Sequence, residues 1–262
     1  MKKILLVSLW LVLSSQASCS DEHRPVQSSD ISLDSTASLT IAYEGDAETG
    51  FSDDEKQLIT DLLRHGEQEV RTLLPTLPDV IEVTAMVIDR NVDIVGGVTG
   101  RADAPGKVLI EFSNVFPGGI SAAAQSGLSS TIFHEFHHLA RGWTIQENKF
   151  GPGIPIAAVN EGLATVFAEE YTGVYFEEAY SYPKDAAAWL QEILALPVDA
   201  DYSTWMMGEH PDGRNSIGYR VGRYIVHQAT ANSGTSILEL SRLAPDEILR
   251  LAETPALGGN VP

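Results

Sequence analysis

Residues 134–138 read His-Glu-Phe-His-His and lie inside a segment, residues 128–141, whose apolar residues recur with the period of a helix. Residues four apart lie one turn above each other on a helix, so His134 and His138 can present imidazole nitrogens to a single metal ion. Glu135 then lies beside the ion rather than on it. The pattern His-Glu-x-x-His on a helix is typical of zinc sites in which the glutamate acts as a base. We therefore predict a metal site here.

The remaining residues of this helix indicate how it is packed. Ile132, Phe136 and Leu139 form an apolar stripe roughly opposite the two histidines, as expected of a helix buried between two layers. His137 lies on neither face, and we interpret it as a flanking residue or as a support for a ligand. A pairing of His134 with His137, three residues apart, is the alternative that the spacing leaves open.

A second helix, predicted over residues 157–171, contains a candidate third ligand. It carries Asn-Glu-Gly-Leu-Ala at residues 160–164, and the small residues on the face of Glu161 let this helix approach another one closely. A catalytic zinc site needs three protein ligands and an open fourth position, and two histidines with one glutamate are a standard set. We expect Glu161 to complete the site and one Zn²⁺ per chain. The alternative is a surface glutamate on an amphipathic helix.

The N-terminus has the features of an export signal. Residues 1–18 carry two lysines, an apolar run and small residues, a pattern too short to span a membrane. Cys19 lies where such a signal is cut, and the stretch resembles a bacterial lipoprotein signal, which implies lipidation of Cys19. Gln16 stands where lipoprotein signals favour leucine, so cleavage by the ordinary signal peptidase is the alternative. We expect a signal peptide over residues 1–18, a polar tether over residues 19–37 and one domain over residues 38–262.

Composition restricts the possible partners. The chain has 17 basic and 36 acidic residues, for a formal net charge of −19. Such a surface repels phosphate backbones and anionic lipid, so we expect no nucleic-acid partner and membrane contact only through the N-terminal anchor. The chain has one cysteine and therefore no internal disulfide, so stability must come from the core and from a bound metal.

The pattern of predicted elements gives the fold class. Strands are predicted at residues 39–43, 80–88, 94–99 and 107–112, and Ser52 to Glu55 form a capping box that opens a long helix. From residue 121 onward the pattern is almost wholly helical, with helices at residues 185–196, 218–231, 238–243 and 246–251 after the two described above. We expect an α+β fold with a β-rich N-terminal half, a mostly helical C-terminal half and the active-site cleft between them. A peptide would lie along residues 94–99.

Three stretches together resemble one protein family. Residues 134–138, Glu-Gly-Leu-Ala at 161–164 and Gly-Tyr-Arg-Val-Gly at 218–222 are similar to the bacterial domain family described as predicted zinc-dependent proteases, within the zincin-like gluzincin group. The resemblance spans about residues 126–251.

The resemblance implies specific roles for four residues. It implies His134, His138 and Glu161 as zinc ligands and Glu135 as the catalytic base. Thr165 stands where some gluzincins carry an aspartate that orients a histidine, so the group that orients the histidines stays open.

The expected function is that of an exported zinc metallopeptidase, located in the periplasm or at the cell surface, that cleaves a peptide or protein substrate by metal-activated water. Tyr219 is our candidate for stabilising the negative oxygen of the tetrahedral intermediate, with His227 and then His210 as the other candidates. Residues 202–213 are expected to form a loop that borders the cleft.

Two alternative functions stay open. One is a zinc hydrolase of a non-peptide amide or ester. The other is an inactive metal-binding surface lipoprotein, in which His210 or His227 would be a fourth ligand.

Overall fold

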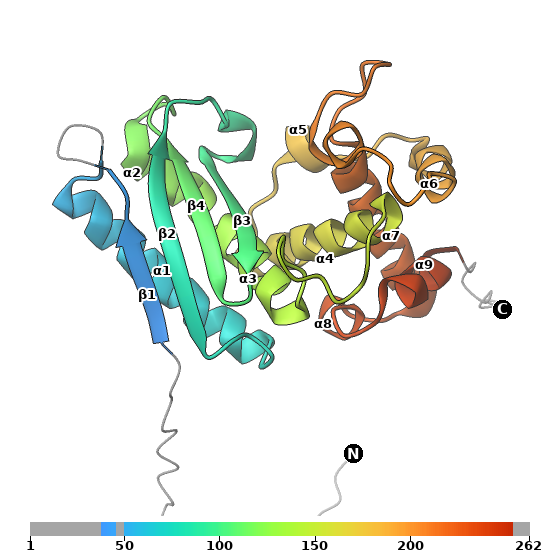
Figure 1. The fold of residues 1–262 in the computed structure, drawn as a ribbon, viewed down its shortest axis with the longest axis horizontal. Coiled ribbons are helices and arrows are strands. Elements are labelled where there is room, and N and C mark those ends of the chain that lie inside the picture. Colours follow the sequence, from blue (N-terminus) through green and yellow to red (C-terminus); the bar gives the residue numbers. More distant parts are fainter. Residues whose placement is uncertain (1–37, 46–49, 254–262) are drawn as a thin grey trace, which may run out of the picture. The chain divides into compact units, whose positions relative to one another are not determined.

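A computed structural model describes residues 38–45 and 50–253 of the chain, and the expected α+β class is confirmed. The N-terminal half carries a mixed sheet with the strand order β1-β2-β4-β3, formed by Ser38–Tyr43, Val80–Ile88, Lys107–Ser113 and Val98–Ala104. Strands β1, β2 and β4 run parallel, whereas β3 pairs antiparallel with β4 and forms an edge (Figure 1). The expected signal peptide and tether, with Cys19, lie outside the described residues.

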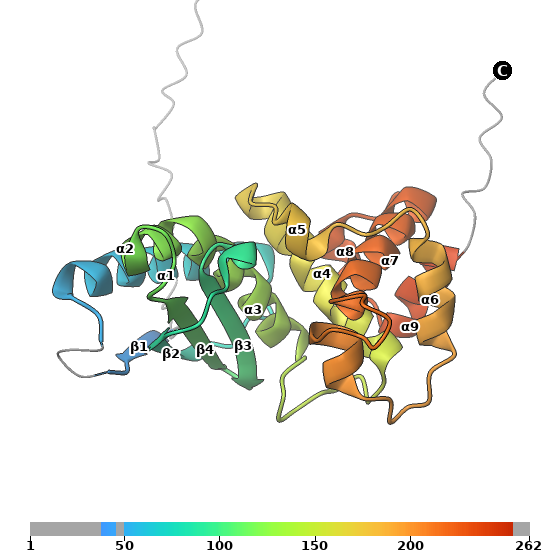
Figure 2. The same ribbon diagram turned by 90° about the horizontal axis from the view of Figure 1, so that it is seen from above.

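The predicted helices are present with small shifts of their ends, together with two short helices, Gly119–Ala123 and Glu177–Tyr180, that the sequence did not indicate. Their bounds are α1 Asp53–Leu73, α2 Gly119–Ala123, α3 Ser129–Arg141, α4 Ile154–Thr172, α5 Glu177–Tyr180, α6 Ala186–Leu194, α7 Ile217–Ser233, α8 Ile237–Leu240 and α9 Pro245–Glu253. Helices α1, α2 and α3 lie on one face of the sheet, and α4 to α9 make up the helical half (Figure 2). Within the described ranges, no helix is both long and apolar enough to cross a membrane.

Helix α1 begins at the predicted capping box and holds α3 against the sheet. The Ser52 hydroxyl accepts a hydrogen bond from the backbone N–H of Glu55, whose side chain returns to the backbone of Ser52. A Cβ atom built on Gly66 would lie 2.8 Å from Cγ2 of Ile132, so the two helices approach each other closely at this glycine. The buried stripe of Ile132, Phe136 and Leu139 on α3 is confirmed.

The predicted strand over residues 94–99 is wrong. Asp93–Val95 forms a 3₁₀ turn, and Gly96 and Gly97 both have positive φ, 73° and 81°. Two successive left-handed residues cannot continue a strand, so β3 begins only at Val98 and runs on to Ala104. The edge strand that faces the cleft is therefore four residues further along the chain than expected.

Helices α4 and α7 pack with their backbones almost in contact. A Cβ atom on Gly162 would lie 2.2 Å from the backbone of Gly222, and one on Gly222 would lie 2.0 Å from the carbonyl oxygen of Ala158. Only glycine permits this approach. The close approach expected of the small residues around Glu161 is thus present, and it fixes α7, which carries Tyr219, against the helix that carries Glu161.

Candidate metal centre

Three side chains from α3 and α4 converge on one point. The Nε2 atoms of His134 and His138 lie 3.0 Å apart, and Oε2 of Glu161 lies 3.1 Å from the first and 3.2 Å from the second. In a tetrahedral zinc site with ligand bonds near 2.0–2.1 Å, the ligand atoms lie about 3.3 Å from one another. The three atoms therefore have the spacing that one Zn²⁺ requires. They form the one group of three or more possible metal ligands within residues 38–45 and 50–253.

The sequence periodicity explains why the histidines meet, and the close packing of α3 and α4 brings the glutamate to them. Helix α3 follows a π-helical stretch, Ala124–Leu128, without a break and ends at Gly142, which has a φ of 68°. The T-shaped arrangement of the two imidazole rings, with centroids 4.7 Å apart, is that of residues one turn apart. Asn160 and Glu161 are both buried, so this glutamate is not on a surface.

Glu161 is held in its ionised form. Burial acts to raise its pKa, but the charge of His138 and the hydrogen bonds from both histidines bring the pKa well below its usual range. Its second oxygen, Oε1, lies 3.4 Å from the indole Nε1 of Trp143 and 3.5 Å from the hydroxyl of Tyr202, and both groups donate to it. An anionic oxygen oriented in this way suits a zinc ligand.

Glu135 lies between the histidines and the edge strand. Its side chain is 6% exposed, and a Cβ atom on Gly100 of β3 would lie 2.6 Å from its Cγ. Burial raises the pKa of Glu135 to about 7, although the charge of His134 and a hydrogen bond from the Ala102 backbone act in the opposite direction. A carboxyl group with this pKa can both accept and return a proton near neutral pH.

His137 is neither a flanking residue nor a ligand. It is fully buried, its Nε2 lies 2.9 Å from Oγ of Ser241, and its ring packs 5.2 Å from that of Phe167. It thus points from α3 into the helical half, away from the three converging ligand atoms. The alternative pairing of His134 with His137 is therefore wrong.

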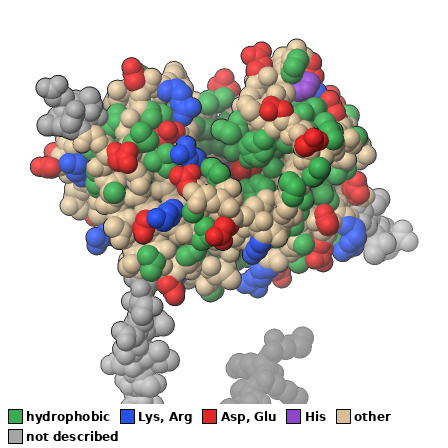
Figure 3. All heavy atoms as spheres, viewed as in Figure 1, with side chains coloured by type: hydrophobic (Ala, Val, Ile, Leu, Met, Phe, Trp, Pro, Cys, Tyr) green, Lys and Arg blue, Asp and Glu red, His purple; other side chains and the backbone are tan. Residues whose placement is uncertain are grey.

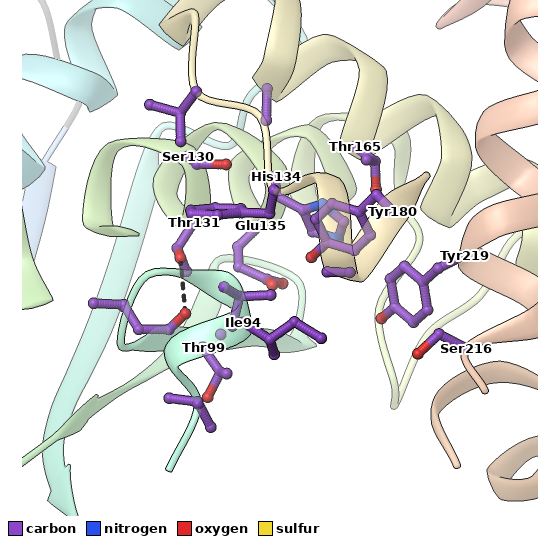
Figure 4. A pocket seen from close by; sticks show the side chains of 18 of the residues that line it. Ile94, Thr99, Ser130, Thr131, His134, Glu135, Thr165, Tyr180, Ser216 and Tyr219 are labelled. Carbon is purple, nitrogen blue, oxygen red and sulfur yellow. Dashed lines mark hydrogen bonds between the residues drawn. The ribbon is translucent and has the colours of Figure 1, made fainter. Parts of the chain in front are cut away.

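Tyrosine side chains cover the cleft side of the site. The ring of Tyr219 stacks on His134 with centroids 6.3 Å apart and lies 5.9 Å from the ring of Tyr180. The Tyr219 hydroxyl and the Glu135 carboxylate face each other across the pocket (Figure 4). Burial, followed by the charge of Glu161, raises the pKa of Tyr219 well above its usual range, so its hydroxyl keeps its proton and can donate it in a hydrogen bond.

His227 and His210, the alternative candidates for the role of Tyr219, lie outside the cleft. Nδ1 of His227 lies 3.2 Å from the hydroxyl of Tyr182, and burial lowers the pKa of His227 to about 4. His210 pairs with Asp212 at 2.9 Å and packs on Trp205. Neither His227 nor His210 lines the cleft or belongs to the converging group.

Three further side chains belong to the site and were not predicted from the sequence. Tyr180 is in the short helix α5, and Trp143 follows α3. Tyr202 begins the stretch that was expected to border the cleft, which it does, but residues 203–207 form a π-helical turn and not the predicted loop. A short element or an isolated aromatic residue carries no periodic signal, so only Tyr202 could have been suspected from sequence.

Two cavities meet at the centre and make one cleft. One has a volume of about 290 Å³ and the other of about 810 Å³, and both are lined by Gly100, His134, Glu135 and Tyr219. Hydrophobic side chains gather around the hollow (Figure 3). The exposed ones that line the cleft are Ile94, Ile145, Val198, Tyr202 and Met207. The three converging side chains are thus accessible from a mostly apolar groove.

Two buried polar atoms near the site have no hydrogen-bond partner within the described residues. Among the described residues, the buried Nδ1 of His138 has no hydrogen-bond partner. The hydroxyl of Thr165 is also buried without a partner and so does not orient either imidazole.

Comparison with known families agrees with this geometry. The model of a family described as predicted Zn-dependent protease (DUF2268) matches residues 75–250, which contain the three converging side chains, Glu135 and Tyr219. Searches among curated proteins and among solved structures find no match to this chain.

Proposed function

The chain belongs to the family of predicted Zn-dependent proteases, and on this premise we propose that it is an exported zinc metallopeptidase that hydrolyses peptide bonds. One observation carries the proposal. Two imidazole nitrogens and one carboxylate oxygen lie 3.0–3.2 Å apart, at the spacing of zinc ligands, with the Glu135 carboxyl beside them in an open cleft.

Each residue of the centre has a distinct role in the proposed reaction. His134, His138 and Glu161 hold the metal, and a bound zinc ion supplies a Lewis acid that polarises a carbonyl group and acidifies water. Glu135 accepts a proton as the water oxygen attacks the peptide carbonyl, and it then gives that proton to the amine nitrogen as the C–N bond breaks. The Tyr219 hydroxyl donates a hydrogen bond to the negative oxygen that forms in between.

The number of ligands favours catalysis over a structural metal. Structural zinc sites are closed by four protein ligands, whereas catalytic sites have three and an open position. Within the described residues the converging group contains three, and neither His210 nor His227 belongs to it. The inactive metal-binding lipoprotein is therefore the weaker alternative.

The edge strand favours a peptide over a smaller amide or ester. The carbonyl of Ala102 accepts a hydrogen bond from the backbone of Ile145, outside the sheet. Backbone groups alternate in direction along a strand, so Gly100 also directs its N–H and C=O away from β4 and toward the cleft. An extended peptide can pair with the N–H and C=O of Gly100 as an added strand, whereas the outward carbonyl of Ala102 is already bonded to Ile145 and its N–H to Glu135. This pairing replaces the expected docking along residues 94–99.

The proposed location rests on the sequence alone. The secretory pattern of residues 1–18 supports export, and Cys19 supports lipid anchoring to a membrane in the periplasm or at the cell surface.

Metal analysis together with a digest of a mixed peptide library tests the proposal. We expect one zinc per purified chain and cleavage that a chelator abolishes and added zinc restores. A zinc-free protein with unchanged folding, or a zinc-loaded protein that cleaves esters but no peptide, would contradict it.

A further inference from the structure

The smaller cavity lies at one end of the edge strand. It is lined by Ile94, Val98, Thr165 and Tyr180 and shares Gly100 with the larger cavity, whereas Arg101 and Ala102 line only the larger one. Because β3 runs from Val98 to Ala104, the smaller cavity flanks the N-terminal end of the strand and the larger cavity its C-terminal end. The inference below rests on the proposed peptidase function.

The direction of the strand assigns the cavities to the two sides of the cleaved bond. Antiparallel pairing is more stable per residue than parallel pairing, so a substrate added to β3 runs antiparallel to it. Substrate residues that follow the scissile bond then lie beside Val98, and those that precede it lie beside Ala102. The smaller cavity therefore takes the side chain directly after the scissile bond.

This cavity contains an unused hydrogen-bonding group. Thr165 is 2% exposed, and within the described part of the chain its hydroxyl has no partner. Threonines in helices commonly bond the carbonyl one turn earlier, as Thr131 does to Gly127 at 3.1 Å and Thr172 does to Ala168 at 2.6 Å. Figure 4 shows the Thr165 hydroxyl directed into the pocket. A buried hydroxyl left without a partner destabilises the fold, so a ligand that bonds it binds better.

The charges around the cavity indicate what that ligand is. The acidic residues that line this cavity are Glu135 and Glu169. Both carboxylate oxygens of Glu169 already bond Arg223, at 2.9 and 3.0 Å. A charged substrate side chain would therefore lose its hydration without gaining a free counter-charge. The apolar walls, which include Val98 and Ala179, suit an aliphatic stem.

We propose that Thr165 is a specificity-determining residue, whose hydroxyl bonds an uncharged polar group at the end of the substrate side chain that follows the scissile bond. Glutamine has this chemistry, and methionine is its apolar match in length and shape. The two side chains thus isolate the contribution of one hydrogen-bonding group.

The test compares two peptides that differ only in having glutamine or methionine at that position. In Thr165→Val, which keeps the shape and removes the hydroxyl, the ratio of kcat/KM for glutamine over methionine should fall about three- to tenfold. Thr165→Ser should keep the wild-type ratio. Thr131→Val is the matched control, because Thr131 lines the same cavity but its hydroxyl is already bonded to the carbonyls of Gly127 and Val98, so the ratio should not change.

Two outcomes would overturn the inference. If the ratio of kcat/KM for glutamine over methionine is unchanged in a folded Thr165→Val protein, the Thr165 hydroxyl does not bond the substrate side chain. An equal loss for both peptides, accompanied by weaker zinc binding, would show that Thr165 supports the metal ligands instead.

Measurements of peptide binding test this inference independently of the proposed reaction. Glu135→Gln and the double variant Glu135→Gln with Thr165→Val are titrated with both peptides by calorimetry, which needs no turnover. A glutamine preference that disappears in the double variant supports the pocket even if the wild type cleaves nothing. Equal affinities of the two peptides in both proteins contradict it.

Discussion

Nε of Arg141 lies 2.9 Å from Oδ1 of Asn160, and this bond joins the two helices that carry the three converging ligands. Both side chains are buried. Arg141 also donates to the backbone carbonyls of Ser241 and Leu243, so one guanidinium ties α3 to α4 and to the turn between α8 and α9. Asn160 directly precedes Glu161, so this bond fixes the position of Glu161 relative to the histidines.

Asn160→Ala should weaken zinc binding and lower stability. The substitution leaves a buried guanidinium donor without its partner, which costs about 1–3 kcal/mol of unfolding free energy. Loss of such a supporting bond typically reduces metal affinity about 10- to 100-fold. Chelator competition measures the affinity, and denaturant titration of the metal-free protein measures the stability.

Asn232→Ala is the control for that experiment. Asn232 on α7 donates to the carbonyls of Leu251 and Ala252 at 3.0 Å, so its loss should also lower stability. Zinc affinity should stay unchanged in this variant. Equal affinities for Asn160→Ala and the wild type would show that the Arg141 bond does not position the ligand.

Glu135→Gln should keep zinc and lose turnover. Glutamine retains the shape of the side chain but cannot accept a proton from water, so kcat should fall by about 10²–10⁴. Glu170→Gln on the exposed face of α4 should behave as the wild type. Peptide turnover and zinc content are measured on the same samples, and turnover retained in Glu135→Gln would remove Glu135 from the mechanism.

The same substitution should change how the stability of the metal-free protein depends on pH. Burial raises the pKa of Glu135 from 4.5 to about 7, so the folded state binds this proton more tightly than the unfolded chain. The resulting stabilisation is complete below pH 4.5 and is lost as pH rises through 7, a difference of about 3 kcal/mol. Metal-free Glu135→Gln should therefore be more stable than the wild type at pH 8.

Denaturant titration of both proteins under chelation at pH 4 and pH 8 checks this sign. The advantage of the variant should be largest at pH 8 and smallest at pH 4. The opposite order would show that the folded protein favours the ionised form of Glu135.

The pair of ligand helices could be predicted from sequence because their chemistry is local. The period of the helix fixes the spacing of His134 and His138, and the face of Glu161 follows from the small residues beside it. The partners of Glu161 could not be predicted in this way. Trp143 and Tyr202 come from separate segments that only the tertiary packing brings together.

The error over residues 94–99 has a different origin. Ile94 and Val95 favour a strand by side-chain type, but Gly96 and Gly97 take left-handed conformations that composition does not reveal. His137 was misplaced because its partner, Ser241, lies 104 residues further along the chain. A contact of that separation leaves no trace in local periodicity.

Cys19→Ser should release the protein from membranes. A lipid on the cysteine sulfur would hold the chain at a membrane, and the hydroxyl of serine cannot take its place. Fractionation of cells that express each form measures the membrane-bound share. An unchanged soluble fraction in the variant would favour cleavage by the ordinary signal peptidase.

The last prediction concerns Tyr219, which lies in a cluster of tyrosines. Tyr180 and Tyr202 also line the cleft, and Tyr202 already donates to Glu161 at 3.5 Å. Tyr219 differs because its ring stacks on His134 and its hydroxyl faces Glu135 across the pocket (Figure 4). The negative oxygen of the intermediate forms between those two sides, so Tyr219 is placed to donate to it.

Tyr219→Phe should therefore lower kcat by about 10²–10³ while KM and zinc content stay nearly unchanged, because the lost bond exists only in the transition state. Tyr180→Phe is the matched control. The ring centroid of Tyr180 lies 5.9 Å from that of Tyr219, and loss of the Tyr180 hydroxyl should alter kcat much less. A fall of less than threefold in Tyr219→Phe, with a large fall in Tyr202→Phe, would move the role to Tyr202. His227 does not supply this hydrogen bond, because its ring is bonded to Tyr182 outside the cleft.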